Sequence, residues 1–241
     1  MENQREKRVH TSLLAAIEKR CLIWMARRIP PAVNSDHLTA LGALAMPLLC
    51  LCYGAAPQRP WALVVGVLLL AVNWFGDSLD GTLARVRGHE RPRYGFYVDH
   101  VLDAVGILFV IGGLVLAGFM SLAIGAGFLI AYYLLTIEIA LATHTVGTFR
   151  ISYWKFGPTE LRILLAAGTL QLLRSPEVTL FGSRFLLFDV GGAIAIAGLL
   201  MTATVAAIGN TRTLYRAEPL PAAARRKANN TNRQVAILPA P

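Results

Sequence analysis

The sequence predicts an all-α integral membrane protein with six transmembrane helices, preceded by an amphipathic helix at the membrane interface. Of its 241 residues, 55% are hydrophobic and only 15% are charged, whereas soluble domains carry about 25% charged residues. Its uncharged residues also form runs long enough to cross a hydrocarbon core of about 30 Å. We therefore expect one transmembrane domain at 37–211, between an N-terminal segment at 1–36 and a basic, disordered tail at 212–241.

The N-terminal segment is expected to form an amphipathic helix on the cytoplasmic face of the membrane. Its apolar residues recur at helical spacing opposite its Lys and Arg residues, which is typical of an interfacial helix; a soluble surface helix is the alternative. Pro30 and Pro31 end this helix, and Asn34, Ser35 and Asp36 offer caps for the next one. The early residues are charged, so no signal peptide is expected.

The uncharged runs predict where the six spans lie. Residues 104–137 are 34 uncharged residues, which would reach about 51 Å as one helix. This run must fold back inside a membrane, and the expected reversal is at 118–121. The six expected spans are 38–58, 61–85, from about 95 to the reversal, from the reversal to about 144, 161–173 and 190–211.

The positive charges predict the orientation of these spans. On the six-span arrangement, 20 of the 23 Lys and Arg residues lie on one side of the membrane. The positive-inside rule then places both termini and the loop after the second span in the cytoplasm, in a multi-pass protein of the cell membrane. Anionic lipid surfaces explain the net charge of +9, so no nucleic-acid partner is expected. The three cysteines, Cys21, Cys50 and Cys52, are interpreted as reduced structural thiols.

Four aspartates lie at the ends of two apolar segments: Asp77 and Asp80, then Asp99 and Asp103 after a polar loop. Spacings of three and four residues place each pair on one helix face. If the two helices are neighbours, the carboxylates converge on one pocket and need cations between them. Each carboxylate costs roughly 2.5–3.5 kcal/mol at mid-membrane, which favours a functional role. Oxygen ligands favour Mg²⁺ or Mn²⁺, and four carboxylates are enough for a pair of ions; a cluster neutralised by nearby Arg residues is the structural alternative.

These aspartates belong to the pattern D-x2-D-G-x2-A-R-x9-G-x3-D-x3-D. It resembles the signature of the CDP-alcohol phosphatidyltransferase family, integral-membrane enzymes that join a phosphoalcohol to a lipid, and all eight fixed positions agree over 27 residues. The resemblance implies transfer of a phosphatidyl group from a CDP-linked donor, with CDP-diacylglycerol favoured, to the hydroxyl of a small alcohol, with release of CMP. A CDP-aminoalcohol acting on diacylglycerol is the alternative within the family. The resemblance also implies a homodimer.

The same resemblance implies a role for each residue of the motif. Asp77, Asp80 and Asp99 correspond to metal ligands, and Asp103 to the general base that takes a proton from the acceptor hydroxyl and also contacts a metal. The implied nucleotide-binding positions are Gly81, Ala84, Arg85 and Gly95. Family members often carry Pro-Asn-x-x-Thr before the first span. Here Thr39 fits that element, but its Asn position is Asp36 or is displaced to Asn34.

Other polar residues are weaker candidates. Basic residues in the cytoplasmic loops are candidates for binding an acceptor phosphate, with contact to lipid head groups as the alternative. They are Arg87, Arg150 and Lys155, and also Arg91, Arg93 and Arg162. Glu138 lies within a span, where it either serves a function or pairs with a polar group of another helix. His144 is interpreted as interfacial, and 154–160 as a turn and helix start that helps shape the acceptor pocket.

Two other classes of protein use acidic residues and remain as alternatives. An intramembrane cation transporter would use the aspartates as a relay, but it gains nothing from Arg85 or from the small residues Gly81 and Ala84. A prenyl-group transferase would carry its acidic motifs on distant loops, whereas here Arg85 and Asp99 are 14 residues apart.

Overall fold

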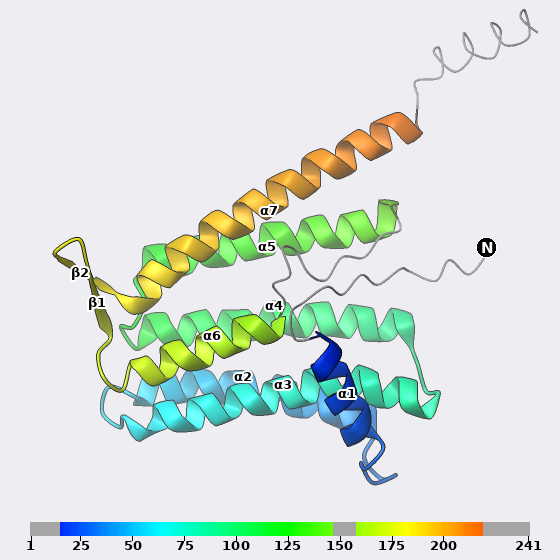
Figure 1. The fold of residues 1–241 in the computed structure, drawn as a ribbon, viewed down its shortest axis with the longest axis horizontal. Helices are drawn as coiled ribbons and strands as arrows, with labels where there is room; N and C mark the ends of the chain where they lie inside the picture. Colours follow the sequence, from blue (N-terminus) through cyan, green and yellow to red (C-terminus); the bar gives the residue numbers. More distant parts are fainter. Residues whose placement is uncertain (1–14, 147–157, 219–241) are drawn as a thin grey trace, which may run out of the picture.

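The computed structural model describes residues 15–146 and 158–218 (Figure 1). The N-terminal half of the described chain forms α1 (Ala15–Ala26), α2 (Ser35–Ala55), α3 (Trp61–Arg87) and α4 (Pro92–Leu116). After these come α5 (Leu122–Val146), α6 (Pro158–Gln171), the strands β1 (Glu177–Leu180) and β2 (Ser183–Leu186), and α7 (Leu187–Ala217). The helix α2 packs on α3 and α4, α6 and α1 pack on α3, and α5 packs on α7.

Five of the described helices are long and apolar enough to cross a membrane: α2, α3, α4, α5 and α7. The expected fifth span corresponds to α6, which has 14 described residues and would reach only about 21 Å. The count of six spans is therefore not confirmed. The fold-back is confirmed, because α4 ends at Leu116 and Gly118 adopts φ +75° before α5 begins. The C-terminal ends of α5 and α7 lie on the same side of the molecule as α1, opposite the hairpin β1–β2 (Figure 1).

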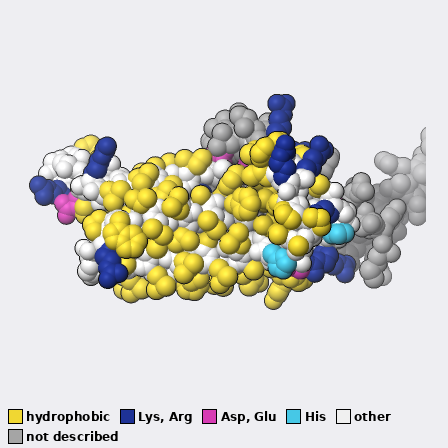
Figure 2. All heavy atoms as spheres, turned by 90° about the horizontal axis from the view of Figure 1, so that it is seen from below, with side chains coloured by type: hydrophobic (Ala, Val, Ile, Leu, Met, Phe, Trp, Pro, Cys, Tyr) yellow, Lys and Arg dark blue, Asp and Glu magenta, His cyan; other side chains and the backbone are white. Residues whose placement is uncertain are grey.

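The surface has the pattern that a membrane requires. Figure 2 shows hydrophobic side chains over the middle of the molecule, with Lys and Arg gathered toward its two ends. Large apolar side chains such as Leu51 and Leu116 are exposed. Lipid tails would cover them, since exposed apolar area of this extent is rare on soluble monomers. The placement of the two ends relative to the cytoplasm stays a prediction.

Glycines set the closeness of α2 and α3. A Cβ atom built on Gly76 would lie 2.5 Å from the Leu38 carbonyl oxygen and 2.6 Å from the Gly42 nitrogen. Only a residue without a side chain permits such an approach of two backbones. As a result, the α3 segment that carries Asp77 and Asp80 lies directly against the first two turns of α2.

The helix α1 packs on protein rather than lying free on a lipid surface. Leu22 and Ala26 are buried with Leu38, Leu79 and Leu83 of α2 and α3. The predicted interfacial amphipathic helix is therefore not confirmed: α1 is a helix, but it buries Leu22 against the motif helix. This burial is a tertiary contact, which the periodicity of one segment does not report.

Two loops show how the ends of the spans are built. Gly88 adopts φ +67° and, with His89, caps the last carbonyls of α3, so α3 ends two residues after Arg85 of the motif and Pro92 starts α4. The predicted connection 174–189 contains the antiparallel hairpin β1–β2. Its two-residue turn has positive φ at Phe181 and Gly182, as tight hairpins require.

Candidate functional site

Three aspartates from two helices meet beside the α2–α3 contact. Asp77 of α3 and Asp99 and Asp103 of α4 each offer a carboxylate oxygen, and these oxygens lie within 4.8 Å of one another. The structure therefore brings together three of the four predicted metal ligands. The side chain of Asp77 is 26% exposed and that of Asp99 is 51% exposed, so the cluster opens at the surface of α4.

Asp80 lies one turn from Asp77, outside this three-residue cluster, and is held by α2. Its carboxylate accepts a hydrogen bond from Thr39 Oγ1 at 2.6 Å and another from the Gly81 amide. Ser35 Oγ donates to the Asp80 carbonyl oxygen at 2.9 Å. Thr39, which matched the family pattern in the sequence, thus positions one of the motif carboxylates.

Asn34 and Asp36, the two candidates for the Asn position of the family pattern, have different partners in the structure. Asn34 is the N-cap of α2, and its side chain accepts a hydrogen bond from the His37 amide at 3.0 Å. Asp36 instead forms an ion pair with Arg91. The hydrogen bond to Asp36 raises the pKa of Arg91. Both side chains therefore have partners within the protein, and a nucleotide-binding role for this element stays untested.

An arginine from α6 is the direct partner of Asp77. Arg162 Nη2 contacts Asp77 Oδ2 at 2.5 Å, and its side chain is only 15% exposed. The same guanidinium donates from Nε to Asn73 Oδ1 at 2.9 Å, and Asn73 Nδ2 donates to the Gly42 carbonyl at 3.0 Å. This network fixes the Asp77 carboxylate between α2, α3 and α6. The sequence had placed Arg162 only among the acceptor-phosphate candidates and had missed Asn73, although Asn73 precedes Asp77 by four residues on the same helix face.

The predicted nucleotide-binding residues lie on α3 and α4, the two helices that carry the aspartates. Arg85 Nη2 donates to Thr82 Oγ1 at 3.0 Å, and a Cβ atom on Gly81 would lie 3.4 Å from the Arg85 guanidinium. A Cβ atom on Gly95 would meet nothing within 4 Å among the described residues. The backbone at Gly95 is thus accessible to a ligand.

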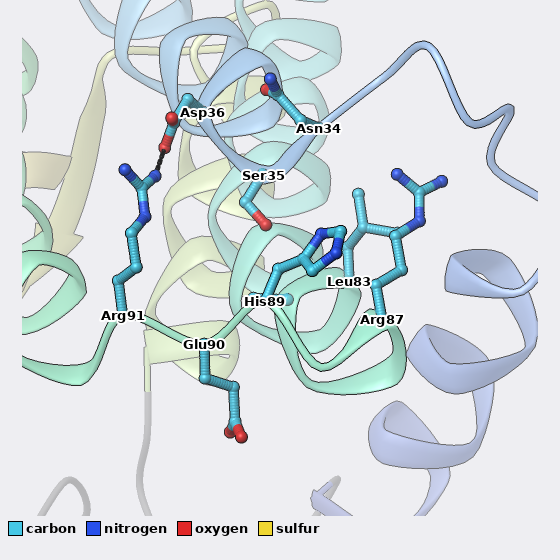
Figure 3. Close-up of a pocket in the computed structure, with 9 residues that line it drawn as sticks. Asn34, Ser35, Asp36, Leu83, Arg87, His89, Glu90 and Arg91 are labelled. Carbon is cyan, nitrogen blue, oxygen red and sulfur yellow. Dashed lines mark hydrogen bonds and ion pairs between the residues drawn. The ribbon is translucent and has the colours of Figure 1, made fainter.

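A pocket of about 400 Å³ lies between the N-terminal end of α2 and the C-terminal end of α3 (Figure 3). Ser35 lies between the Asp36–Arg91 pair and His89, while Glu90 points away from the pocket (Figure 3). The lining residues are Asn34, Ser35, Asp36, Leu83, Ala84, Arg87, His89, Glu90 and Arg91. Ala84 of the motif lines this pocket, and the lining residue Ser35 donates a hydrogen bond to the Asp80 carbonyl oxygen.

The acceptor-phosphate candidates have separate outcomes. Arg87 donates to the carbonyls of Val33, Ile29 and Pro30 at 2.5–3.0 Å, so its guanidinium ties the α1–α2 connection to α3. Its binding of a phosphate stays a prediction that these contacts do not favour. Arg150 and Lys155 lie outside the described residues, as does most of the 154–160 segment.

The intramembrane carboxylate of α5 has a protein partner. Asn210 Nδ2 of α7 donates to Glu138 Oε1 at 2.6 Å, which agrees with pairing to a polar group of another helix. His144 is exposed near the end of α5. Neither residue joins the group formed by Asp77, Asp99 and Asp103.

The aspartate cluster fits a divalent metal ion. Its potential ligands are carboxylate oxygens from three side chains, the donor type that Mg²⁺ and Mn²⁺ prefer. Two of the three come from consecutive turns of α4 and the third from α3, so an ion there would join the two helices. Arg162 supplies part of the positive charge that so many carboxylates require.

Comparison with known proteins identifies a family that the chain matches. The family model described as CDP-alcohol phosphatidyltransferase matches residues 33–211, which includes the whole aspartate motif. The chain is also 30% identical over 106 residues to an archaetidylinositol phosphate synthase of Methanothermobacter thermautotrophicus. That match covers 42% of this chain and 51% of the relative, so the chain spans about half of that protein.

Proposed function

The chain belongs to the CDP-alcohol phosphatidyltransferase family, and from this premise we propose that it transfers a phosphatidyl group from a CDP-linked lipid to a small alcohol. The observation that carries the proposal is the meeting of Asp77, Asp99 and Asp103 oxygens within 4.8 Å. In the reaction, the acceptor hydroxyl oxygen forms a bond to the phosphorus of the lipid phosphate. The bond from that phosphorus to the bridging oxygen breaks, and CMP leaves.

Asp103 is proposed to accept the proton of the attacking hydroxyl. A general base must lie within hydrogen-bond reach of its proton, and Asp103 lies on the open α4 side of the cluster. Asp77, Asp80 and Asp99, together with Asp103, are proposed to hold two Mg²⁺ or Mn²⁺ ions. Such ions would offset the negative charge of the pyrophosphate and of the leaving CMP. Arg162 orients Asp77 for this task through its 2.5 Å contact.

The nucleotide is proposed to lie along the motif helices. Gly81, Ala84 and Gly95 leave backbone accessible, and Arg85 would contact a phosphate of the donor, because a guanidinium forms bidentate contacts with phosphate oxygens. The pocket beside Ser35 and Ala84 is of suitable size for a base and ribose. Thr39 would support this site through its hydrogen bond to the Asp80 carboxylate.

For the acceptor, a phosphorylated polyol is the leading candidate. The named product of the archaeal relative, archaetidylinositol phosphate, points to an inositol phosphate as acceptor and a CDP-linked lipid as donor. The basic residues Arg150 and Lys155 would then bind its phosphate. The family alternative, a CDP-aminoalcohol acting on diacylglycerol, uses the same aspartates.

A cation transporter is less well supported. A relay of carboxylates gains from free acidic groups, but here Asp77 pairs with Arg162 and Asp80 accepts from Thr39. A permanent guanidinium within the cluster would repel a passing cation. We further propose a homodimer in the cell membrane with the motif on the cytoplasmic side, as the distribution of basic residues supports.

The decisive experiment measures CMP release from purified protein in nanodiscs. CDP-diacylglycerol and CDP-ethanolamine are each supplied with Mn²⁺, the first with inositol phosphate, glycerol phosphate, inositol or serine, the second with diacylglycerol. Acceptor-dependent CMP release that chelation by EDTA abolishes is expected with one pairing. If no pairing releases CMP while the protein retains its fold and binds Mn²⁺, the proposal is wrong.

A further inference from the structure

One carboxylate oxygen of α1 joins three helices. Glu18 Oε1 accepts a hydrogen bond from Trp74 Nε1 of α3 at 2.9 Å. The same oxygen accepts a second hydrogen bond from Thr159 Oγ1 of α6 at 2.8 Å. Hydrogen bonds to a carboxylate are among the stronger ones in proteins. Glu18 therefore connects segments that are 56 and 141 residues away along the chain.

Both partners of Glu18 lie next to the residues that hold Asp77. Trp74 directly follows Asn73, which accepts a hydrogen bond from Arg162 Nε. Thr159 precedes Arg162 by three residues, so the two side chains lie on the same face of the first turns of α6. Arg162 in turn contacts Asp77. A continuous set of contacts thus runs from α1 to the aspartate cluster.

We propose that Glu18 is a positioning residue: it holds the first turn of α6 against α3 and so sets the place of the Arg162 guanidinium on Asp77. This inference rests on the proposed function only for its effect on turnover. Glu18 touches neither the aspartates nor a substrate, and acts through Thr159 and Arg162.

The packing of α1 does not require this carboxylate. Leu22 and Ala26 already bury α1 against Leu38, Leu79 and Leu83. The far end of α6 is fixed separately, by the buried hydrogen bond between Thr169 and Tyr53 at 2.8 Å. The hydrogen bonds of Glu18 therefore stabilise mainly the first turn of α6.

The first test measures hydrogen exchange without any substrate. In Glu18→Ala, amide exchange of residues 162–165, the first amides of α6 with partners inside the helix, is expected to rise about tenfold, because the first turn of α6 loses its hydrogen bond to α1. Exchange in α2 should not change. Glu18→Gln keeps an acceptor oxygen and is expected to restore slow exchange. Lys19→Ala, an exposed neighbour on α1, is the matched control.

The second test measures turnover. Glu18→Ala and Thr159→Val are expected to lower kcat about five- to tenfold with each KM within about twofold, because they disturb the aspartates rather than binding. Thr159→Ser retains the hydroxyl and should retain activity. In an Arg162→Lys background, adding Glu18→Ala should change kcat by less than about twofold, as expected for residues of one network.

The outcomes separate the two proposals. Unchanged exchange at 162–165 in Glu18→Ala overturns the positioning role. Raised exchange with unchanged kcat, or fully additive losses in the double variant, overturns the action through Arg162. A wild-type protein that releases no CMP overturns the proposed function instead, and the exchange data then still decide whether Glu18 holds α6.

Discussion

The two helices that carry the motif treat their aspartates differently. On α3, Asp77 is paired with Arg162 and Asp80 accepts from Thr39. On α4, Asp99 and Asp103 are exposed at the surface. The glycines differ in the same way. Gly76 of α3 is pressed against the backbone of α2, whereas a side chain at Gly95 of α4 would meet open space within the described structure.

This difference suggests a division of labour in the site. The α3 half is preorganised by side chains of α2 and α6, so its geometry costs little to maintain when a substrate binds. The α4 half is accessible, as a base and a nucleotide-binding surface must be. Substitutions on α3 should therefore act through geometry or folding, and substitutions on α4 through chemistry or substrate binding.

The largest effect is expected at the open half. Asp103→Asn removes the proposed base and should lower kcat by about 10²–10⁴-fold, the usual contribution of a general base. Binding of CDP and Mn²⁺, measured by calorimetry, should be largely retained because the other carboxylates remain. Full activity in this variant would remove Asp103 from the role of base.

Gly76→Ala tests the packed half. Its Cβ would lie 2.5 Å from the Leu38 carbonyl oxygen, and overpacking of this kind typically costs about 1–3 kcal/mol. We expect a clear fall in the melting temperature in detergent, together with lost activity. An unchanged melting temperature would mean that α2 and α3 are farther apart than described.

Thr39→Val keeps the shape of the side chain but removes the hydroxyl whose hydrogen bond Asp80 Oδ2 accepts at 2.6 Å. A hydrogen bond to a charged group is worth about 1.5–3 kcal/mol, so kcat/KM should fall about tenfold or more. Thr39→Ser keeps the hydroxyl and serves as the control. Equal losses in both variants would argue against this hydrogen bond as the cause.

Gly95→Ala is the counterpart of the Gly76 variant on α4. The melting temperature should be retained, because the added Cβ has room and Ala favours the helix. If the nucleotide passes close to this backbone, KM for the CDP-linked donor should rise about three- to tenfold with little change in kcat. Unchanged KM would place the nucleotide elsewhere.

The smallest effect is expected at the rim of the pocket. Asp36→Asn breaks the ion pair with Arg91, in which both side chains are about half exposed. Exposed pairs contribute little to stability, so neither the melting temperature nor kcat at saturating donor should change measurably. A large loss of activity would show that this pair, rather than the α3–α4 cluster alone, takes part in binding.

Much of the fold follows from local patterns in the sequence. The uncharged runs predicted the spans, and the excess length of 104–137 predicted the reversal that Gly118 makes. The fifth span was less well predicted: α6 is described for 14 residues, and the sequence around it mixes apolar and charged residues. The hairpin at 177–186 was also missed, because a short connection carries no strong periodicity.

Within the site, the sequence predicted the residue types but not all of their partners. The spacing of Asp99 and Asp103 places both on one face of α4, and the structure brings them to Asp77. Asp80 was also expected among the ligands; its carboxylate accepts a hydrogen bond from Thr39, and its role as a ligand stays a prediction. Arg162 was weighed for a different task, since nothing in the local sequence indicates that α6 packs beside Asp77.

By itself, the sequence determined that this is a helical membrane protein with an aspartate motif of a known family, because hydrophobic runs and helical spacing are local properties. Only the tertiary structure decided which aspartates are held and which are open: Thr39 and Arg162 contact Asp80 and Asp77, while Asn73 contacts Arg162 and Glu18 contacts Thr159. These contacts join residues 41 to 141 positions apart. Such pairings depend on how whole helices pack, which no single stretch of sequence encodes.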